Sequence, residues 1–243
     1  MERTPDLELQ VAVAKVSKYA VSESGDTVEL IERPHGGLSV VMVDGQRSGK
    51  SAKAISNIVA RKAVSLLADG VRDGAAARAA HDYLRTMRGG QVSATLNIVS
   101  VDLVTRTIVL SRNSHCPVVI AGDGGSEIRV LDEPSQAIGI HNRTRPVMAE
   151  MPIKPDIHVV VFTDGVLAAG QREGRTLDAP AFIQQELATC SQPCARSLAD
   201  ALLNRAVELD RGRPSDDISV LVMSVVRRQQ PDSTRRLSVR FPI

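Results

Sequence analysis

Residues 40–52 have the sequence Val40-Val41-Met42-Val43-Asp44-Gly45-Gln46-Arg47-Ser48-Gly49-Lys50-Ser51-Ala52. An apolar run stops at a carboxylate, turns through glycines and enters a segment with helical character. Two chemistries fit this layout. An aspartate at the end of a buried strand, followed by a glycine with a free carbonyl, is half of a divalent-metal site. The same stretch is also one residue short of a phosphate-cradling P-loop, because only three residues separate Gly45 from Gly49 and Asp44 stands where the first glycine belongs.

On both sides of this stretch, hydrophobic periodicity predicts short strands interrupted by pairs of helices. Residues 7–16 alternate apolar and polar side chains, and residues 28–31 continue after the turn Ser24-Gly25-Asp26, so we expect a hairpin with an acid at its bend. Further strands are expected at residues 38–43, 95–102, 107–113, 118–121, 128–131, 147–151, 157–163 and 218–226. Helices are expected at residues 51–67, 73–87, 179–189 and 194–209.

The order of these elements favours one fold class. Most consecutive strands are joined by turns too short for a parallel crossover, so the sheets should be antiparallel. We therefore predict an α+β fold, an antiparallel β-sandwich flanked by two pairs of helices, as a single domain over residues 1–228. A polar, basic tail at residues 229–243 follows, with a linker at residues 229–234. A P-loop nucleotide hydrolase would alternate strand and helix throughout, which makes it the weaker alternative.

Composition narrows the range of partners. The chain of 243 residues has 30 basic and 28 acidic residues, two tyrosines, three phenylalanines and no tryptophan. We expect no nucleic-acid ligand, because basic and acidic residues nearly balance and few aromatic side chains are present on which bases could stack. No apolar stretch approaches membrane length, so no membrane partner is expected. An odd number of cysteines and an N-terminus unlike a signal peptide indicate the cytoplasm.

Carboxylates stand at the ends of three apolar strands. Asp44 and Asp164 each follow a strand and precede a glycine, while Asp216-Asp217 precedes the last strand. If the last strand runs antiparallel to the other two, these acids lie on one rim of the sheet, within reach of Asp26. Each alone is usually a turn residue. Together they need compensation for their charge, and oxygen-only donors point to Mg²⁺ or Mn²⁺ rather than zinc. Two such ions with a bridging hydroxide suit hydrolysis of a phosphate ester.

These motifs resemble the metal-dependent protein phosphatases (PPM family), in particular the bacterial SpoIIE and RsbX type. The similar segments, over roughly residues 8 to 226, are Ser24-Gly25-Asp26, Asp44-Gly45-Gln46-Arg47-Ser48-Gly49, Asn113-Ser114-His115-Cys116-Pro117, Gln136-Ala137-Ile138-Gly139-Ile140, Phe162-Thr163-Asp164-Gly165-Val166 and Asp216-Asp217-Ile218-Ser219.

The resemblance implies a serine/threonine protein phosphatase in which water on two Mn²⁺ or Mg²⁺ ions attacks phosphorus directly. The metal ligands and catalytic acids that it implies are Asp26, Asp44, the Gly45 carbonyl, Asp164 and Asp216, with Asp217 behind them or on an extra metal. The implied substrates are phosphorylated STAS-domain proteins of a stressosome or anti-sigma-factor pathway. Because about six residues precede the first strand, we expect a standalone domain of the RsbX type.

Departures from the family pattern leave alternatives open. Arg47 replaces a glycine, and Arg47 and Lys50 either stabilise charge on the phosphoryl group or are a solvated pair. A catalytically silent scaffold is the alternative that Arg47 favours and the retained acids oppose. We interpret His115 as structural, because it is remote in sequence from every acid, with a general acid as the alternative. The tail at residues 235–243 either frays or adds as an edge strand, to this chain or to a second copy in a homodimer.

Overall fold

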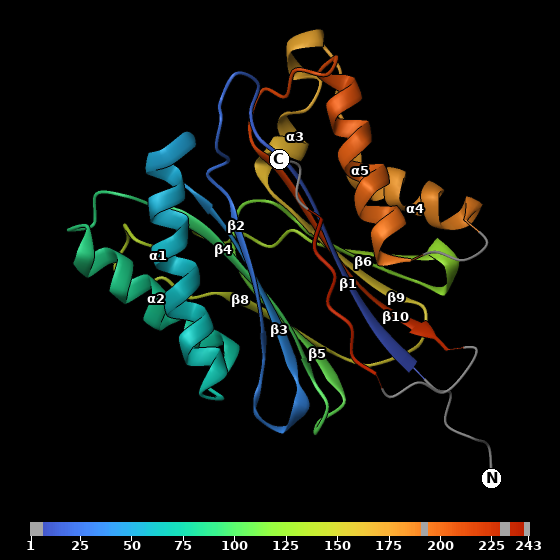
Figure 1. The fold of residues 1–243 in the computed structure, drawn as a ribbon, viewed down its shortest axis with the longest axis horizontal. Coiled ribbons are helices and arrows are strands. Elements are labelled where there is room, and N and C mark those ends of the chain that lie inside the picture. The colour runs from blue at the N-terminus through green and yellow to red at the C-terminus, as the bar shows by residue number, and fades with distance from the viewer. Residues whose placement is uncertain (1–6, 191–193, 229–233, 241–243) are drawn as a thin grey trace.

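The computed structural model describes residues 7–190, 194–228 and 234–240. Two five-stranded antiparallel sheets pack face to face, and a pair of longer helices covers the outer face of each (Figure 1). The predicted α+β sandwich is confirmed.

The first sheet has the strand order β1-β10-β9-β6-β7, with β1 at Leu7–Val16, β10 at Ile218–Arg227, β9 at Ile157–Phe162, β6 at Val118–Gly122 and β7 at Glu127–Leu131. The second sheet has the order β2-β3-β4-β5-β8, with β2 at Thr27–Glu32, β3 at Leu38–Gly45, β4 at Ala94–Asp102, β5 at Thr107–Asn113 and β8 at Val147–Pro152. Helices α1 (Gly49–Ala68) and α2 (Asp73–Met87) cover the second sheet, and α4 (Ala179–Thr189) and α5 (Ala195–Leu209) cover the first. The periodicity missed a short helix, α3 (Asp164–Ala168), and three 3₁₀ turns at Pro34–Gly36, Asp123–Gly125 and Gln171–Glu173.

Strand β3 is buried on both faces, which explains its uninterrupted apolar sequence. Val40 and Met42 point into the sandwich, where they join a core that includes Leu221 of β10. Val41 and Val43 point the other way and pack beneath α1 and α2. All four side chains are fully buried. A strand covered on both sides has no polar face, so a continuous apolar run replaces alternation.

The predicted hairpin of the first two strands is wrong. β1 pairs along its whole length with β10, from Leu7 opposite Arg227 to Val16 opposite Ile218, whereas β2 pairs with β3 in the other sheet. The intervening residues 17–26 form a crossover between the sheets. This connection is longer than the tight turns that close hairpins, so the two strands are free to find different partners. The crossover carries Asp26 to the gap between the sheets.

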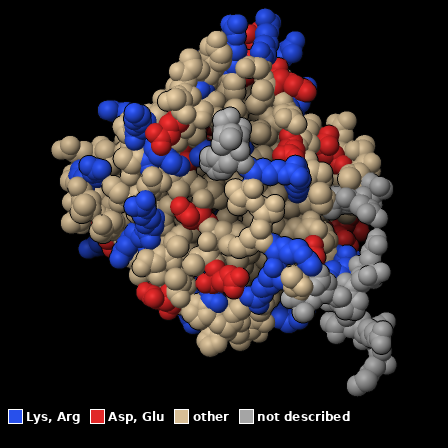
Figure 2. All heavy atoms as spheres, viewed as in Figure 1, with Lys and Arg blue, Asp and Glu red and all other residues tan. Residues whose placement is uncertain are grey.

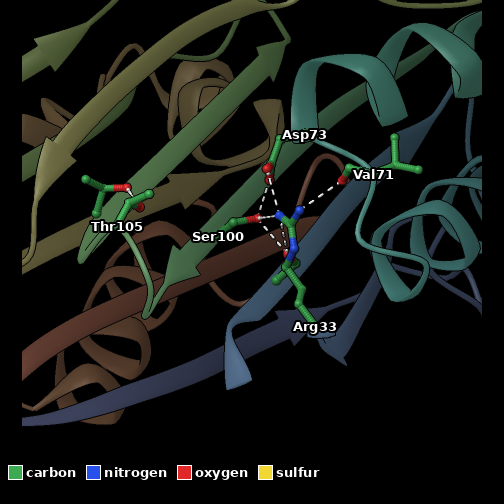
Figure 3. A network of polar contacts seen from close by, with 7 residues as sticks. Arg33, Val71, Asp73, Ser100 and Thr105 are labelled. Carbon is green, nitrogen blue, oxygen red and sulfur yellow. Dashed lines mark hydrogen bonds and ion pairs between the residues drawn. The ribbon is translucent and has the colours of Figure 1, made fainter. Parts of the chain in front are cut away.

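A buried ion pair ties the beginning of α2 to the second sheet. The Arg33 guanidinium, 15% exposed, lies 2.8 Å from the carboxylate of Asp73, 6% exposed, and donates to the Val71 carbonyl at 2.9 Å (Figure 3). The second Asp73 oxygen accepts from the Ser100 hydroxyl, which is also within 2.6 Å of the Ser39 hydroxyl. The network joins the residue after β2, the beginning of α2, β3 and β4, so it fixes how α2 sits on the second sheet.

In residues 234–240 there is no strand, and Leu237 and Val239 are exposed while Arg235 pairs with Glu32 at 2.9 Å, so an edge strand does not form within this part of the tail. The linker expected at residues 229–234 lies, except for Thr234, outside the described residues, as do residues 1–6. Within the described chain, no helix combines the length and apolarity needed to cross a bilayer. The face shown in Figure 2 mixes basic and acidic side chains.

Removing the Asp73 carboxylate should strongly destabilise the protein. Asp73→Ala leaves the Arg33 charge buried without its partner, which typically costs about 3–5 kcal/mol. Urea unfolding measures the change. Glu208→Ala is the control, since its pair with Arg205 lies on the exposed face of α5 and should contribute less than about 1 kcal/mol. Equal effects of the two variants would contradict a stabilising role for the buried network.

Candidate active site

The four predicted ligand acids come together, but from two sheets rather than one rim. In the second sheet Thr27 lies opposite Val43, which brings the preceding Asp26 beside Asp44. In the first sheet β10 runs antiparallel to β9 as expected, and the pairing of Phe162 with Val220 brings the end of β9 to the beginning of β10. The single-rim prediction is wrong because β3 belongs to the other sheet.

A cavity of about 360 Å³ opens where the two sheets bring these acids together. Its wall consists of Lys18, Asp44, Gly45, Gln46, Arg47, Ser48, Ser93, Ala94, Thr95, His115, Ala137, Asp164, Asp216 and Asp217. Asp26 lies deeper, fully buried behind this wall.

The glycines that follow Asp44 and Asp164 each allow the main chain of another segment to approach closely. A Cβ atom on Gly45 would overlap the carbonyl of Ala52 in α1, and one on Gly165 would overlap the carbonyl of Asp217. Each glycine therefore serves packing of main chain at the acid cluster. The P-loop interpretation is wrong, because β3 and its neighbours are antiparallel rather than parts of a strand-helix-strand unit.

Asp26 links the two sheets. Its Oδ2 accepts hydrogen bonds from Ser219 Oγ at 2.6 Å and from Thr163 Oγ1 at 3.2 Å. Ser219 lies in β10 of the first sheet, and Thr163 directly follows β9 of that sheet. The Oδ1 atom of Asp26 is buried and has no hydrogen-bond partner among the described residues. Burial raises the pKa of Asp26 to about 6, and the Ser219 hydroxyl opposes part of this rise. A buried carboxylate oxygen without a donor is a natural ligand for a cation.

Asp44 lies at the electrostatic centre of the cluster. Burial is the main cause that raises the pKa of Asp44 to about 9, and the negative charges of Asp26, Asp164 and Asp216 raise it further. The pKa of Asp164 is raised as well, by burial and then by Asp216. The acids cannot all be ionised together without positive charge among them.

The chemical type of the donor atoms, which are all oxygens, fits a hard divalent cation. Among the described residues, no three His, Cys, Asp or Glu side chains are grouped so that they would hold a metal ion by themselves. Mg²⁺ keeps several water ligands, and backbone carbonyl oxygens also bind hard cations such as Ca²⁺. Carboxylates therefore need not fill the coordination shell alone. The oxygen-only chemistry, the unpartnered Asp26 Oδ1 and the excess negative charge all suit Mg²⁺ or Mn²⁺.

Asp217 differs from the other acids because the main chain occupies both of its oxygens. Oδ1 accepts from the Lys18 N–H at 2.9 Å and Oδ2 from the Gly25 N–H at 2.8 Å, and the residue is 5% exposed. Asp217 therefore closes the crossover at residues 17–26. Of the two positions that the sequence allowed for it, this geometry favours the one behind the ligands.

The two basic residues proposed from sequence are placed differently. Arg47 lies on the cavity wall with its backbone in the left-handed region, at φ 77°. Lys50 is exposed in the first turn of α1 and does not form part of the wall. Sequence reasoning missed Lys18, which reaches the wall from the crossover. No local signal marks Lys18, because its position follows from the pairing of β1 with β10.

His115 is not remote from the acids. Its Nε2 lies 3.9 Å from Asp164 Oδ2, and the side chain is 59% exposed on the cavity wall. The pairing of Val118 with Val161 explains this, because it brings the beginning of β6 to the end of β9. The expectation of a purely structural histidine rested on distance in sequence and is wrong about location.

Comparison with known proteins shows the family of the chain. The model of the family described as Stage II sporulation protein E (SpoIIE) matches residues 34–226. The chain belongs to the SpoIIE family. No curated protein matches it by sequence. The resemblance to the SpoIIE type of metal-dependent phosphatase, predicted from the motifs, is thereby confirmed.

Solved structures share the fold at low identity. The PP2C phosphatase domain of SpoIIE from Bacillus subtilis, with a fragment of its regulatory domain, is 17% identical at a TM-score of 0.79, over 93% of this chain and 66% of that one. The RsbU and RsbW domains of Rv1364c from Mycobacterium tuberculosis are 18% identical at a TM-score of 0.71, over 93% and 62%. RsbX in complex with magnesium is 14% identical at a TM-score of 0.67, over 91% and 100%. The SpoIIE-family chain thus spans less than two thirds of the first two structures.

In the metal-free SpoIIE-family protein, the raised pKa of Asp44 predicts that stability falls as pH rises. Below the ordinary carboxyl pKa near 4, Asp44 is protonated in the folded and unfolded chains alike. Above it the unfolded chain ionises first, and the folded chain follows only near the Asp44 pKa of about 9. The contribution to stability is lost across this window, by up to about 1.4 kcal/mol per pH unit. Urea unfolding with a chelator at several pH values measures it.

Asp44→Asn isolates this effect, since it keeps the size of the side chain and removes the titrating group. The wild-type stability should fall with pH relative to the variant, and added Mn²⁺ should flatten the wild-type slope because ligation favours the ionised carboxylate. Parallel slopes in the two metal-free proteins would show that Asp44 ionises normally.

Proposed function

We propose that this protein is a Mn²⁺- or Mg²⁺-dependent protein serine/threonine phosphatase. One observation carries the proposal. Asp44, Asp164 and Asp216 line one cavity between the two sheets with Asp26 buried behind them, and burial and mutual repulsion favour the protonated form of Asp44 unless cations are present. The membership of the chain in the SpoIIE family and its PP2C-type fold support it.

The metal ligands in this proposal are Asp26, Asp44, the Gly45 carbonyl, Asp164 and Asp216. Bound divalent ions supply an activated water and screen the charge of the phosphoryl group. The residues around them orient the substrate. Arg47 contributes a planar guanidinium suited to two phosphoryl oxygens. Asp217 keeps the crossover closed behind Asp26.

The proposed substrates are phosphoserine or phosphothreonine side chains of regulatory proteins of the STAS type. An RsbU domain of the same fold occurs in one chain with an RsbW domain, which supports a regulatory partner for this family. A cytoplasmic location fits the three cysteines, which are free thiols.

Hydrolysis of an aryl phosphate tests the proposal. We expect turnover that requires Mn²⁺ or Mg²⁺ and falls at least about a hundredfold in Asp164→Asn, since even the loss of a residue that only supports a metal ligand costs about 10–100-fold. Asp200→Asn is the matched control, because this exposed aspartate of α5 pairs with Arg196 and lies outside the cavity lining. A phosphoserine peptide then tests the substrate class.

Two outcomes would contradict the proposal. Turnover that survives both a chelator and Asp164→Asn would assign the hydrolysis to something other than this acid cluster. Calorimetric binding of Mn²⁺ without turnover of either the aryl phosphate or the phosphopeptide would identify a silent scaffold.

A further inference from the structure

Lys18 is a cation on the cavity wall to which the sequence motifs assign no role. It lies in the crossover at residues 17–26, and its side chain forms no ion pair or hydrogen bond with any described residue. Arg47 shares both properties, and it reaches the wall from the loop after β3. Two cations beside a cluster of acids, neither of them paired with a carboxylate, remain available for an anion that enters the cavity.

The backbone of Lys18 is held in place by two contacts to the segment that leads into β10. Its N–H donates to Asp217 Oδ1 at 2.9 Å, while the other Asp217 oxygen holds Gly25 at the far end of the crossover. The next residue, Tyr19, donates its N–H to the Pro214 carbonyl at 2.9 Å. The Arg213 guanidinium lies 5.3 Å from the centre of the Tyr19 ring. The crossover thus presents Lys18 from a fixed main chain.

Arg47 is held in a conformation that is unfavourable for its type. Its φ of 77° lies in the left-handed region, which a residue with a long side chain rarely adopts. Backbone strain of this kind persists where the surrounding structure imposes it, and it is concentrated at functional sites. Arg47 lies on the same wall as Lys18.

The balance of charge in the cavity indicates which kind of anion Lys18 and Arg47 can bind. Two divalent ions would offset the four carboxylates proposed to hold them. The wall carries a fifth carboxylate, Asp217, and Lys15 and Lys53 donate to the main-chain carbonyl of Asp26 close by. A phosphate monoester brings nearly two further negative charges at neutral pH. Lys18 and Arg47 supply two positive charges on the wall, and neither side chain forms an ion pair with a described carboxylate. A phosphodiester carries only one negative charge and gains less from the second cation.

We propose that Lys18 Nζ binds the phosphoryl oxygens of the substrate together with Arg47 and selects dianionic monoesters, with Asp217 as the positioning residue that presents Lys18. This inference rests on the proposed phosphatase function. Lysine acts here as a mobile point charge with three donors, whereas Arg47 offers a planar fork.

The test compares Lys18→Met with wild-type protein loaded with Mn²⁺. We expect KM for an aryl phosphate monoester to rise about 10–100-fold with little change in kcat, as for the loss of one charge-assisted hydrogen bond made equally in the ground and transition states. The preference for the monoester over the corresponding diester should fall by a similar factor. Lys18→Arg should restore much of both. Lys154→Met, an exposed lysine outside the cavity, should change neither.

A second readout does not depend on turnover. Calorimetry with inorganic phosphate on the Mn²⁺-loaded protein should show weaker binding to Lys18→Met, at unchanged Mn²⁺ affinity. Asp217→Asn should weaken phosphate binding in the wild-type background but add little to Lys18→Met, because a positioning residue acts through the residue it positions.

The outcomes separate the two proposals. Turnover by wild-type protein with an unchanged KM and phosphate affinity in Lys18→Met would overturn the role of Lys18 and leave the phosphatase intact. Absence of turnover together with weaker phosphate binding in Lys18→Met would overturn the phosphatase and keep the anion site. A wild-type protein that neither turns over the ester nor binds phosphate would overturn both.

Discussion

The carboxylate of Asp26 is the contact on which the arrangement of the active site depends. Asp26 directly precedes β2, the edge strand of the second sheet. One of its carboxylate oxygens accepts hydrogen bonds from Ser219 and Thr163 of the first sheet. The other oxygen is buried without a partner among the described residues. One side chain therefore both joins the two layers and leaves an acceptor for a cation at their junction. The same carboxylate at position 26 therefore serves both the packing of the two sheets and the proposed binding of a cation.

The packing around the junction explains why the motifs contain the residues they do. Gly45 and Gly165 follow Asp44 and Asp164, and in both places a side chain would collide with the main chain of a neighbouring segment. Asp216 and Asp217 are adjacent in sequence and both border the cavity, but only Asp217 has both carboxylate oxygens bonded to main-chain N–H groups of the crossover. The Asp-Asp motif thus combines a proposed metal ligand, Asp216, with a residue that holds the crossover in place, Asp217.

Much of the architecture was predictable from local patterns. The Ala-rich amphipathic segments became α1 and α2, and the apolar run before Asp44 became a strand buried on both faces. The errors concern which strands are partners. The first two strands were expected to pair, yet β1 joins β10, and the acids were expected on one rim, yet they come from two sheets. His115 and Lys18 were misplaced or missed for the same reason, because both reach the cavity through strand pairing.

The sequence by itself determined the class of chemistry and the kind of fold. Carboxylates after apolar strands, glycines beside them and the absence of His or Cys from the ligand motifs point to hard cations and phosphate, and these signals are local in the chain. Tertiary structure alone decided which acids face one another, which oxygen of Asp26 stays free and which cations border the cavity. The physical reason is that side-chain periodicity reports burial of a segment but not its partner. Partners are chosen by packing between residues as distant in sequence as Asp26 and Ser219.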